Sequence, residues 1–319
     1  MKWVLGLGAS IFAIAMGLAA TTTIPAAAVS IDDAIFKFLP PETQGIVFID
    51  VAALRNASLV RDALKDQKLT SPRGWDDFVQ ATGMVPERDI DKVTIGKLNA
   101  QDGLVIIQGR IDKFKIEQYL KDKGKQSQTY LGQSIYRDDG DGAFVFLDNV
   151  VLVGKVNAVK KAIDQMQLPG SAPLRRDLIA AMQTIEAGNQ VWGVGDFSVN
   201  DLGTLGVRGP APAVEMLKSL KSGTYQMRID TGLHARAIGN FADAESAKNI
   251  VDLARGALAV AKLQIAKDQP DIVQLLDGIQ VSNSGPTLTM RIEEAGELLM
   301  KLKDLRAYSP TREEGWTRH

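Results

Sequence analysis

The chain has 319 residues, of which 37 are basic and 38 acidic, so its formal net charge is −1. A near-neutral chain with both signs interspersed lacks the positive surface that binds nucleic acid, so we expect no nucleic-acid partner. There is no cysteine, which excludes disulfide-stapled folds and lipid attachment through a cysteine thioether. Stability must therefore come from packing.

The N-terminus has the pattern of an export signal. Lys2 is followed by an uncharged apolar run over residues 3–20 and then by small residues up to Ala26-Ala27-Ala28. Signal peptidases cut after small side chains, so we expect residues 1–28 to be a cleaved signal peptide. The apolar run is close to the ~20 residues of a spanning helix, so an uncleaved membrane anchor is the alternative. Either way, the remaining chain is predicted to be extracytoplasmic, either periplasmic or secreted.

Residues 31–168 are predicted to form a first α+β unit, because apolar runs of strand length alternate with helical spacing. In chain order we expect a strand at 45–49, helices at 52–66 and 75–82, strands at 92–98 and 103–108, a helix capped by Asp112, strands at 143–147 and 150–153 turning at Asp148-Asn149, and a helix stopped by Pro169.

A Pro- and Gly-rich linker at 169–174 then leads to a second α+β unit at 175–305. Its expected elements are a helix at 175–186, a strand at 190–197, a helix at 213–220, strands at 223–230 and 233–239, a long helix at 243–267 capped by Asp243, strands at 278–283 and 286–292, and a final helix carrying Leu298, Leu299, Leu302 and Leu305. Residues 306–319 have little periodicity and are predicted to be a disordered tail.

The two units repeat one order of elements. Ile49-Asp50-Val51 is matched by Gly195-Asp196-Phe197, and the first hairpins close on Gly109-Arg110-Ile111 and Gly239-Asn240-Phe241. This match indicates a tandem duplication. The predicted fold class is therefore α+β, with two similar tandem halves, each a mainly antiparallel sheet with helices packed on one face.

Two short motifs lie in the first unit. Leu39-Pro40-Pro41 precedes a strand and a helix, and Leu147-Asp148-Asn149 with Gly154 forms a hairpin that precedes a helix. In these motifs and in its export signal the chain resembles a loose group of exported bacterial α+β proteins of unknown function, over residues 38–166. The resemblance implies no activity.

Candidate chemistry is sparse. The chain has only two histidines, so a histidine base or a zinc site would lack partners, and we expect no cofactor. The densest acidic cluster holds Asp138, Asp139 and Asp141, which are candidate calcium ligands because hard cations prefer carboxylate and carbonyl oxygens. The cluster lacks the span and the closing glutamate of an EF-hand, so a polar turn is the preferred interpretation.

Asp50 and Asp196 are the candidate catalytic pair, since both end apolar strands at matching points of the two units. Two carboxylates that face each other can do acid/base work if one pKa is raised. The alternative is that each aspartate caps the segment that follows it, which is the interpretation we prefer.

Three functions follow from these observations. The first is an exported, non-enzymatic binding or interaction protein of the bacterial cell envelope. The second is a carrier of a hydrophobic ligand such as lipid, which requires an apolar cavity. The third is a carboxylate-only enzyme built on Asp50 and Asp196. The expected partner is an unknown protein or hydrophobic ligand, and membrane contact is expected only through an uncleaved N-terminal segment.

Overall fold

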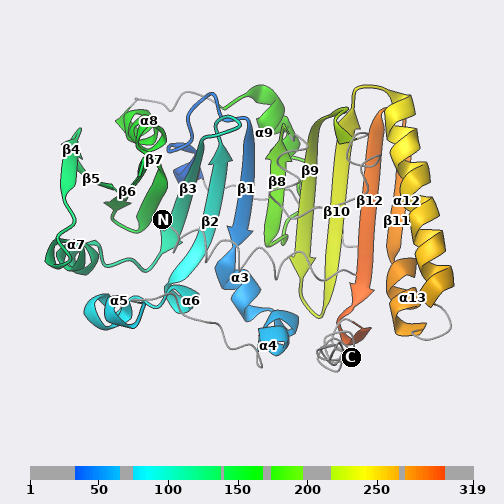
Figure 1. Ribbon diagram of the computed structural model, residues 1–319, viewed down its shortest axis with the longest axis horizontal. Helices are drawn as coiled ribbons and strands as arrows, with labels where there is room; N and C mark the ends of the chain where they lie inside the picture. Colours follow the sequence, from blue (N-terminus) through cyan, green and yellow to red (C-terminus); the bar gives the residue numbers. More distant parts are fainter. Residues whose placement is uncertain are drawn as a thin grey trace, which may run out of the picture.

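The computed structural model describes residues 33–64, 75–137, 140–167, 174–196, 217–265 and 270–298. These residues form an α+β fold on one large antiparallel sheet, which confirms the predicted class (Figure 1). The predicted signal peptide, the predicted tail and residues 169–173 of the predicted linker lie outside the described residues. Within the described part, no helix is both long and apolar enough to cross a membrane.

The sheet has 12 strands, in the order β11-β12-β10-β9-β8-β1-β2-β3-β7-β6-β5-β4. In chain order the strands are β1 (Gly45–Asp50), β2 (Ile90–Lys97), β3 (Gly103–Gly109), β4 (Ser127–Tyr130), β5 (Gln133–Arg137), β6 (Gly142–Leu147), β7 (Val150–Lys155), β8 (Val191–Gly195), β9 (Leu220–Ile229), β10 (Gly232–Phe241), β11 (Ile279–Ser284) and β12 (Thr287–Ala295).

The sheet is continuous across the predicted boundary between the two units. β1 pairs with β8, with Gly45 opposite Gly195 and Ile49 opposite Val191. From this central pair the order reads β2, β3, β7, β6 in one direction and β9, β10, β12, β11 in the other. The expectation of a separate sheet in each unit is therefore wrong, because the first strands of the two units hydrogen-bond to each other.

Helices cover both faces of this sheet. They are α2 (Asp33–Phe36), α3 (Val51–Asn56), α4 (Ser58–Leu64), α5 (Trp75–Thr82), α6 (Pro86–Asp89), α7 (Lys113–Asp122), α8 (Val156–Gln167), α9 (Arg176–Met182), α12 (Ala244–Ile265) and α13 (Pro270–Asp277).

The side chains of β3 show the two faces, because successive residues of a strand point in opposite directions. Leu104 belongs to the core that contains Ile163 of α8, whereas Val105 packs in the cluster around Ile116 of α7. The expectation that helices pack on one face of each sheet is therefore wrong. The apolar stripe of a helix shows that it packs on a sheet but not on which face.

Local signals in the sequence set the ends of several elements. Asp50 and Asp112 each accept a hydrogen bond from the backbone N–H three residues later, as N-caps of α3 and α7. Asp148, in the predicted tight turn, has φ +23°, a value that aspartate tolerates better than most residues. The two caps fix where α3 and α7 begin, and the turn at Asp148 fixes where its hairpin reverses.

Candidate anion-binding site

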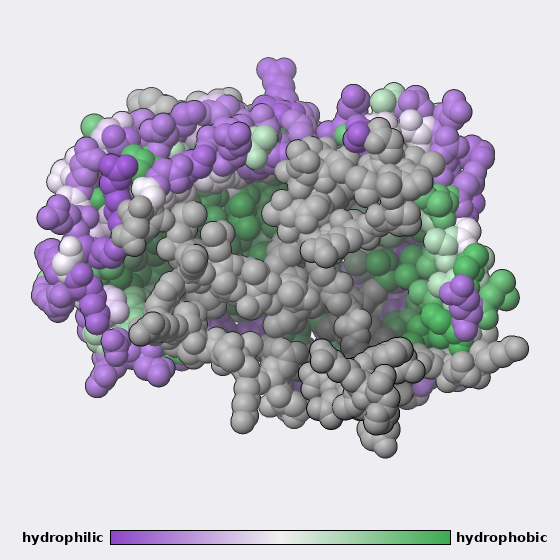
Figure 2. Space-filling view, in the orientation of Figure 1, coloured by the Kyte–Doolittle hydropathy of each residue, from purple (hydrophilic) through white to green (hydrophobic). Residues whose placement is uncertain are grey.

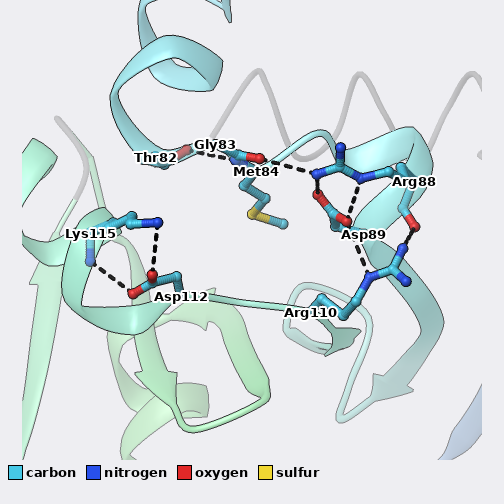
Figure 3. A pocket seen from close by; sticks show the side chains of 8 residues that line it. All are labelled: Thr82, Gly83, Met84, Arg88, Asp89, Arg110, Asp112 and Lys115. Atoms are coloured by element: carbon cyan, nitrogen blue, oxygen red, sulfur yellow. Dashed lines mark hydrogen bonds and ion pairs between the residues drawn. The ribbon is translucent and has the colours of Figure 1, made fainter.

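A pocket of about 380 Å³ opens where β2 begins and β3 ends, between α5, α6 and α7 (Figures 1 and 3). It is lined by Thr82, Gly83, Met84, Arg88, Asp89, Arg110, Asp112 and Lys115. Three of these side chains are cationic and two are carboxylates, so the pocket carries an excess of one positive charge.

Asp89 is the anchor of the pocket. Its side chain is 6 % exposed, and its Oδ2 accepts hydrogen bonds from the backbone N–H of Val85 at 2.8 Å and from Arg88 Nη2 at 2.6 Å. Its Oδ1 accepts from Arg88 Nε at 2.8 Å and from Arg110 Nε at 3.2 Å. One buried carboxylate therefore orients two guanidinium groups (Figure 3).

These contacts keep Asp89 charged. The Arg88 guanidinium holds the pKa of Asp89 well below its usual range, and the backbone N–H of Val85 and the charge of Arg110 act in the same direction. Burial alone would raise this pKa, so the donors outweigh the desolvation.

A glycine lets β3 approach α6 closely enough for this arrangement. A Cβ built on Gly109 would lie 2.0 Å from the backbone oxygen of Asp89, which no side chain can tolerate. The next residue, Arg110, donates its backbone N–H to that same oxygen at 2.8 Å and its Nη2 to the backbone oxygen of Arg88 at 2.5 Å. The backbone contact therefore fixes where the Arg110 side chain begins.

Both arginines keep donors for a ligand. Their side chains are 61 % and 64 % exposed, and neither Nη1 atom has a hydrogen-bond partner among the described residues. Lys115 Nζ lies across the pocket, 3.3 Å from Asp112 Oδ2 (Figure 3). Guanidinium groups that are fixed on one side and open on the other suit a carboxylate or a phosphate.

The pair proposed for acid/base work does not come together. Asp50 N donates to Gln190 O and Asp196 N donates to Gln44 O, so the two aspartates lie at opposite ends of the antiparallel β1–β8 pair. A six-residue strand separates them by roughly 20 Å, too far to share a proton. The expectation that they face each other is therefore wrong.

Each aspartate instead has a local partner. Asp50 Oδ1 accepts from the backbone N–H of Ala53 at 2.7 Å, so this aspartate caps the segment that follows it, as we preferred from the sequence. Asp196 Oδ2 accepts from Arg175 Nη1 at 2.6 Å, an ion pair between residues 21 positions apart that no local pattern predicts.

The calcium prediction concerns three aspartates, and only one is described. Asp138 and Asp139 lie outside the described residues. Asp141 Oδ2 lies 3.6 Å from Lys155 Nζ, which also pairs with Asp102 Oδ1 at 2.8 Å. Within the described ranges, no group of three or more histidine, cysteine or carboxylate side chains is placed to hold a metal ion. Calcium binding by the complete cluster stays a prediction.

The comparisons with known proteins assign no family. No family model and no curated protein matches the chain. Among solved structures, the chain is similar to one described as "Structure of crystal form I of TP0453", with 10 % identity and a TM-score of 0.49. The similarity covers 86 % of this chain and 98 % of that one.

Proposed function

We propose that this chain is an exported, non-enzymatic binding protein of the bacterial cell envelope, and that its pocket binds an anionic group of the ligand, a carboxylate or a phosphate. The observation that carries the proposal is the pair of guanidinium groups oriented on buried Asp89 with both Nη1 atoms open. Because the protein orients these donors in advance, less side-chain entropy is lost when the anion binds.

Binding without catalysis agrees with the state of the carboxylates. Asp89 is ionised and accepts four hydrogen bonds, so it is a poor proton acceptor for a substrate. Asp112 is occupied as the cap of α7 and beside Lys115. Five of the eight residues that line the pocket are charged, whereas a carrier of lipid requires a mainly apolar cavity. An anion site of an interaction protein is therefore the function that this geometry supports best.

The export part of the proposal rests on the N-terminal sequence pattern. N-terminal sequencing of the protein from its natural source tests it directly. A mature chain beginning at Val29 is expected, because Ala28 and Ala26 occupy the −1 and −3 positions. A chain that begins at Met1 in the cytoplasmic fraction would contradict export.

The tandem duplication is also part of this proposal. It is supported by the strand orders on the two sides of the β1–β8 pair, since β2, β3, β7 and β6 on one side correspond to β9, β10, β12 and β11 on the other. The pocket belongs to one copy only, because Arg110 corresponds to Asn240, whose amide donates to Ser222. In this view the duplicated fold is the scaffold, and the binding site was built in one half.

Calorimetric titration with inorganic phosphate tests the pocket. The wild-type chain should bind phosphate saturably, and Arg110→Gln should bind about tenfold more weakly, because a charge-assisted hydrogen bond contributes roughly 1.5–3 kcal/mol. Arg291→Gln is the matched control, since it removes one positive charge from an exposed position in β12. An equal loss of affinity in both variants, or no saturable binding by the wild type, would contradict the proposal.

A further inference from the structure

We infer that α12 carries an interface through which two copies of this chain associate, with their α12 helices packed antiparallel. The inference concerns the end of the sheet remote from the anion pocket and does not depend on it. The surface involved, called here the α12 stripe, consists of Leu253, Gly256, Ala257, Val260 and Leu263.

The α12 stripe is exposed although it is apolar. Leu253 is 41 % exposed, Val260 53 % and Leu263 78 %, and these are three of the five exposed large hydrophobic side chains among the described residues. Gly256 and Ala257 between them are exposed as well. Their spacing of three and four residues places all five on one side of the helix. Figure 2 shows hydrophobic surface on the side of the molecule where Figure 1 draws α12 and α13.

This side of α12 is not the side that packs on its own sheet. Ala247 and Val251 are the buried residues of α12, and they lie on the opposite side of the helix from Gly256 and Leu263. A helix that is apolar all round is normally buried all round. In the second half of α12 the polar residues are Arg255, Lys262 and Gln264, and the apolar side that carries Gly256, Val260 and Leu263 is exposed.

The two charged residues in that half of α12 do not cover the stripe. Arg255 Nε donates to the backbone oxygen of Val281 in β11 at 3.0 Å. Lys262 Nζ lies 2.6 Å from Asp277 Oδ1 at the end of α13. Asp252, which borders the stripe beside Leu253, pairs with Lys248 one turn earlier in α12. Each of these charged side chains therefore has a partner in the same chain.

The order of side chains along the stripe favours a second copy over an unrelated partner. Leucines stand at its two ends, at 253 and 263, and between them Val260 lies one turn from the small residues Gly256 and Ala257. The midpoint is residue 258, so an antiparallel pairing about a twofold axis places Leu253 of one copy beside Leu263 of the other. Gly256 and Val260 would then meet across the axis. A self-complementary surface of this kind is what a twofold interface requires.

The size of the surface sets the strength of the association. Residues 253–263 span about 15 Å of helix, which buries a few hundred Å² per copy, roughly half of what a standard stable interface buries. The structure therefore points to a reversible dimer that dissociates on dilution.

Sedimentation of the full chain across a wide concentration range tests the inference. The wild type should shift from monomer to dimer, and Leu263→Glu should weaken the dimer at least about tenfold, because the glutamate would be desolvated in the interface. Phe114→Glu is the matched control, since Phe114 is also 78 % exposed but lies in α7. It should dimerise as the wild type does. A wild-type monomer at every concentration, or equal effects of both substitutions, would overturn the inference.

The antiparallel arrangement has its own test, because the chain has no cysteine. Leu253→Cys and Leu263→Cys, mixed in equal amounts and oxidised, should form mainly the mixed disulfide between copies. Predominant disulfides between identical variants would overturn the antiparallel geometry. A monomer that instead sediments with phospholipid vesicles, and loses this property in Leu263→Glu, would assign the α12 stripe to a membrane surface and overturn the dimer.

Discussion

The regions around α7 and α12 begin in the same way and present opposite chemistry. Each helix follows a hairpin of the sheet, and each starts at an aspartate cap: Asp112 accepts from Lys115 N at 3.1 Å and Asp243 from Ser246 N at 2.7 Å. The 10-residue α7 borders a charged pocket, whereas the 22-residue α12 exposes an apolar stripe. Capping therefore decides where each helix starts, while surface side chains decide what it can bind.

Each of the two regions also contains a buried acid, and the two acids differ in how readily they ionise. Asp89, beside α7, is held ionised by two arginines. Glu294 of β12, 5 % exposed, lies beside the end of α13, and its Oε1 has no hydrogen-bond partner among the described residues. Burial, together with the negative charge of Asp277, raises the pKa of Glu294 to about 7. One region therefore keeps its buried acid charged, whereas the other favours the neutral form of its acid below about pH 7.

The largest expected effect comes from Glu294. Its pKa is higher in the folded than in the unfolded chain, so stability falls as pH rises from its ordinary value of 4.5 to about 7 and stays low above that. Denaturant unfolding of the wild type should lose up to about 3 kcal/mol across this range. Glu294→Gln should remove most of that dependence. Glu245→Gln, an exposed acid of α12, should leave it intact, and equal pH profiles for the wild type and Glu294→Gln would contradict the account.

Removal of Asp89 should have the next largest effect. Asp89→Ala leaves the N–H of Val85 without its partner and releases both arginines, and should cost about 2 kcal/mol at neutral pH. Because the pKa of Asp89 is lowered on folding, this stabilisation is present above its ordinary value of 3.8 and is lost as pH falls below that value.

Asp91→Ala provides the control for Asp89→Ala. Asp91 is 42 % exposed, and its Oδ1 lies 3.9 Å from Arg55 Nη1, so its loss should change the unfolding free energy by less than about 1 kcal/mol. Equal costs for the two substitutions would show that Asp89 is an ordinary surface acid.

The two helix caps should give the smallest effect. Asp112→Ala and Asp243→Ala should each cost about 1 kcal/mol in the free energy of unfolding, because each removes one cap bond. Similar losses would show that α7 and α12 differ in surface but not in how they begin. A negligible loss in either variant would show that the two helices do not depend on their caps in the same way.

Short-range patterns in the sequence predict much of this fold. The hairpin at Asp148-Asn149 and the caps at Asp112 and Asp243 are found as predicted, because each rests on residues within a few positions. The hairpin expected between the strands at 278–283 and 286–292 is also found, but β11 extends to Ser284 and the turn is Gly285-Pro286. The β4–β5 hairpin is not predicted, since Ser127 to Thr129 are polar and exposed and give no apolar alternation. Pairing of β1 with β8 joins residues about 145 positions apart, for which no local pattern exists.

The candidate site was harder to predict than the fold. Arg110 and Asp89 are 21 positions apart and meet only because the β2–β3 hairpin returns the chain to α6. In the sequence, Asp112 indicates only a cap, and Lys115 lies in a lysine-rich stretch typical of a solvated helix. A buried aspartate with two arginines becomes visible only in three dimensions. The Gly109-Arg110 pair was the one usable signal, since glycine at a strand end often marks a close backbone approach.

NMR of the arginine side chains during a phosphate titration shows whether Arg88 and Arg110 together hold an anion. We predict that the guanidinium signals of these two residues shift in parallel with one saturation curve, while the signal of Arg291 stays unchanged. Equal shifts of all exposed arginines, or none at Arg88 and Arg110, would contradict it.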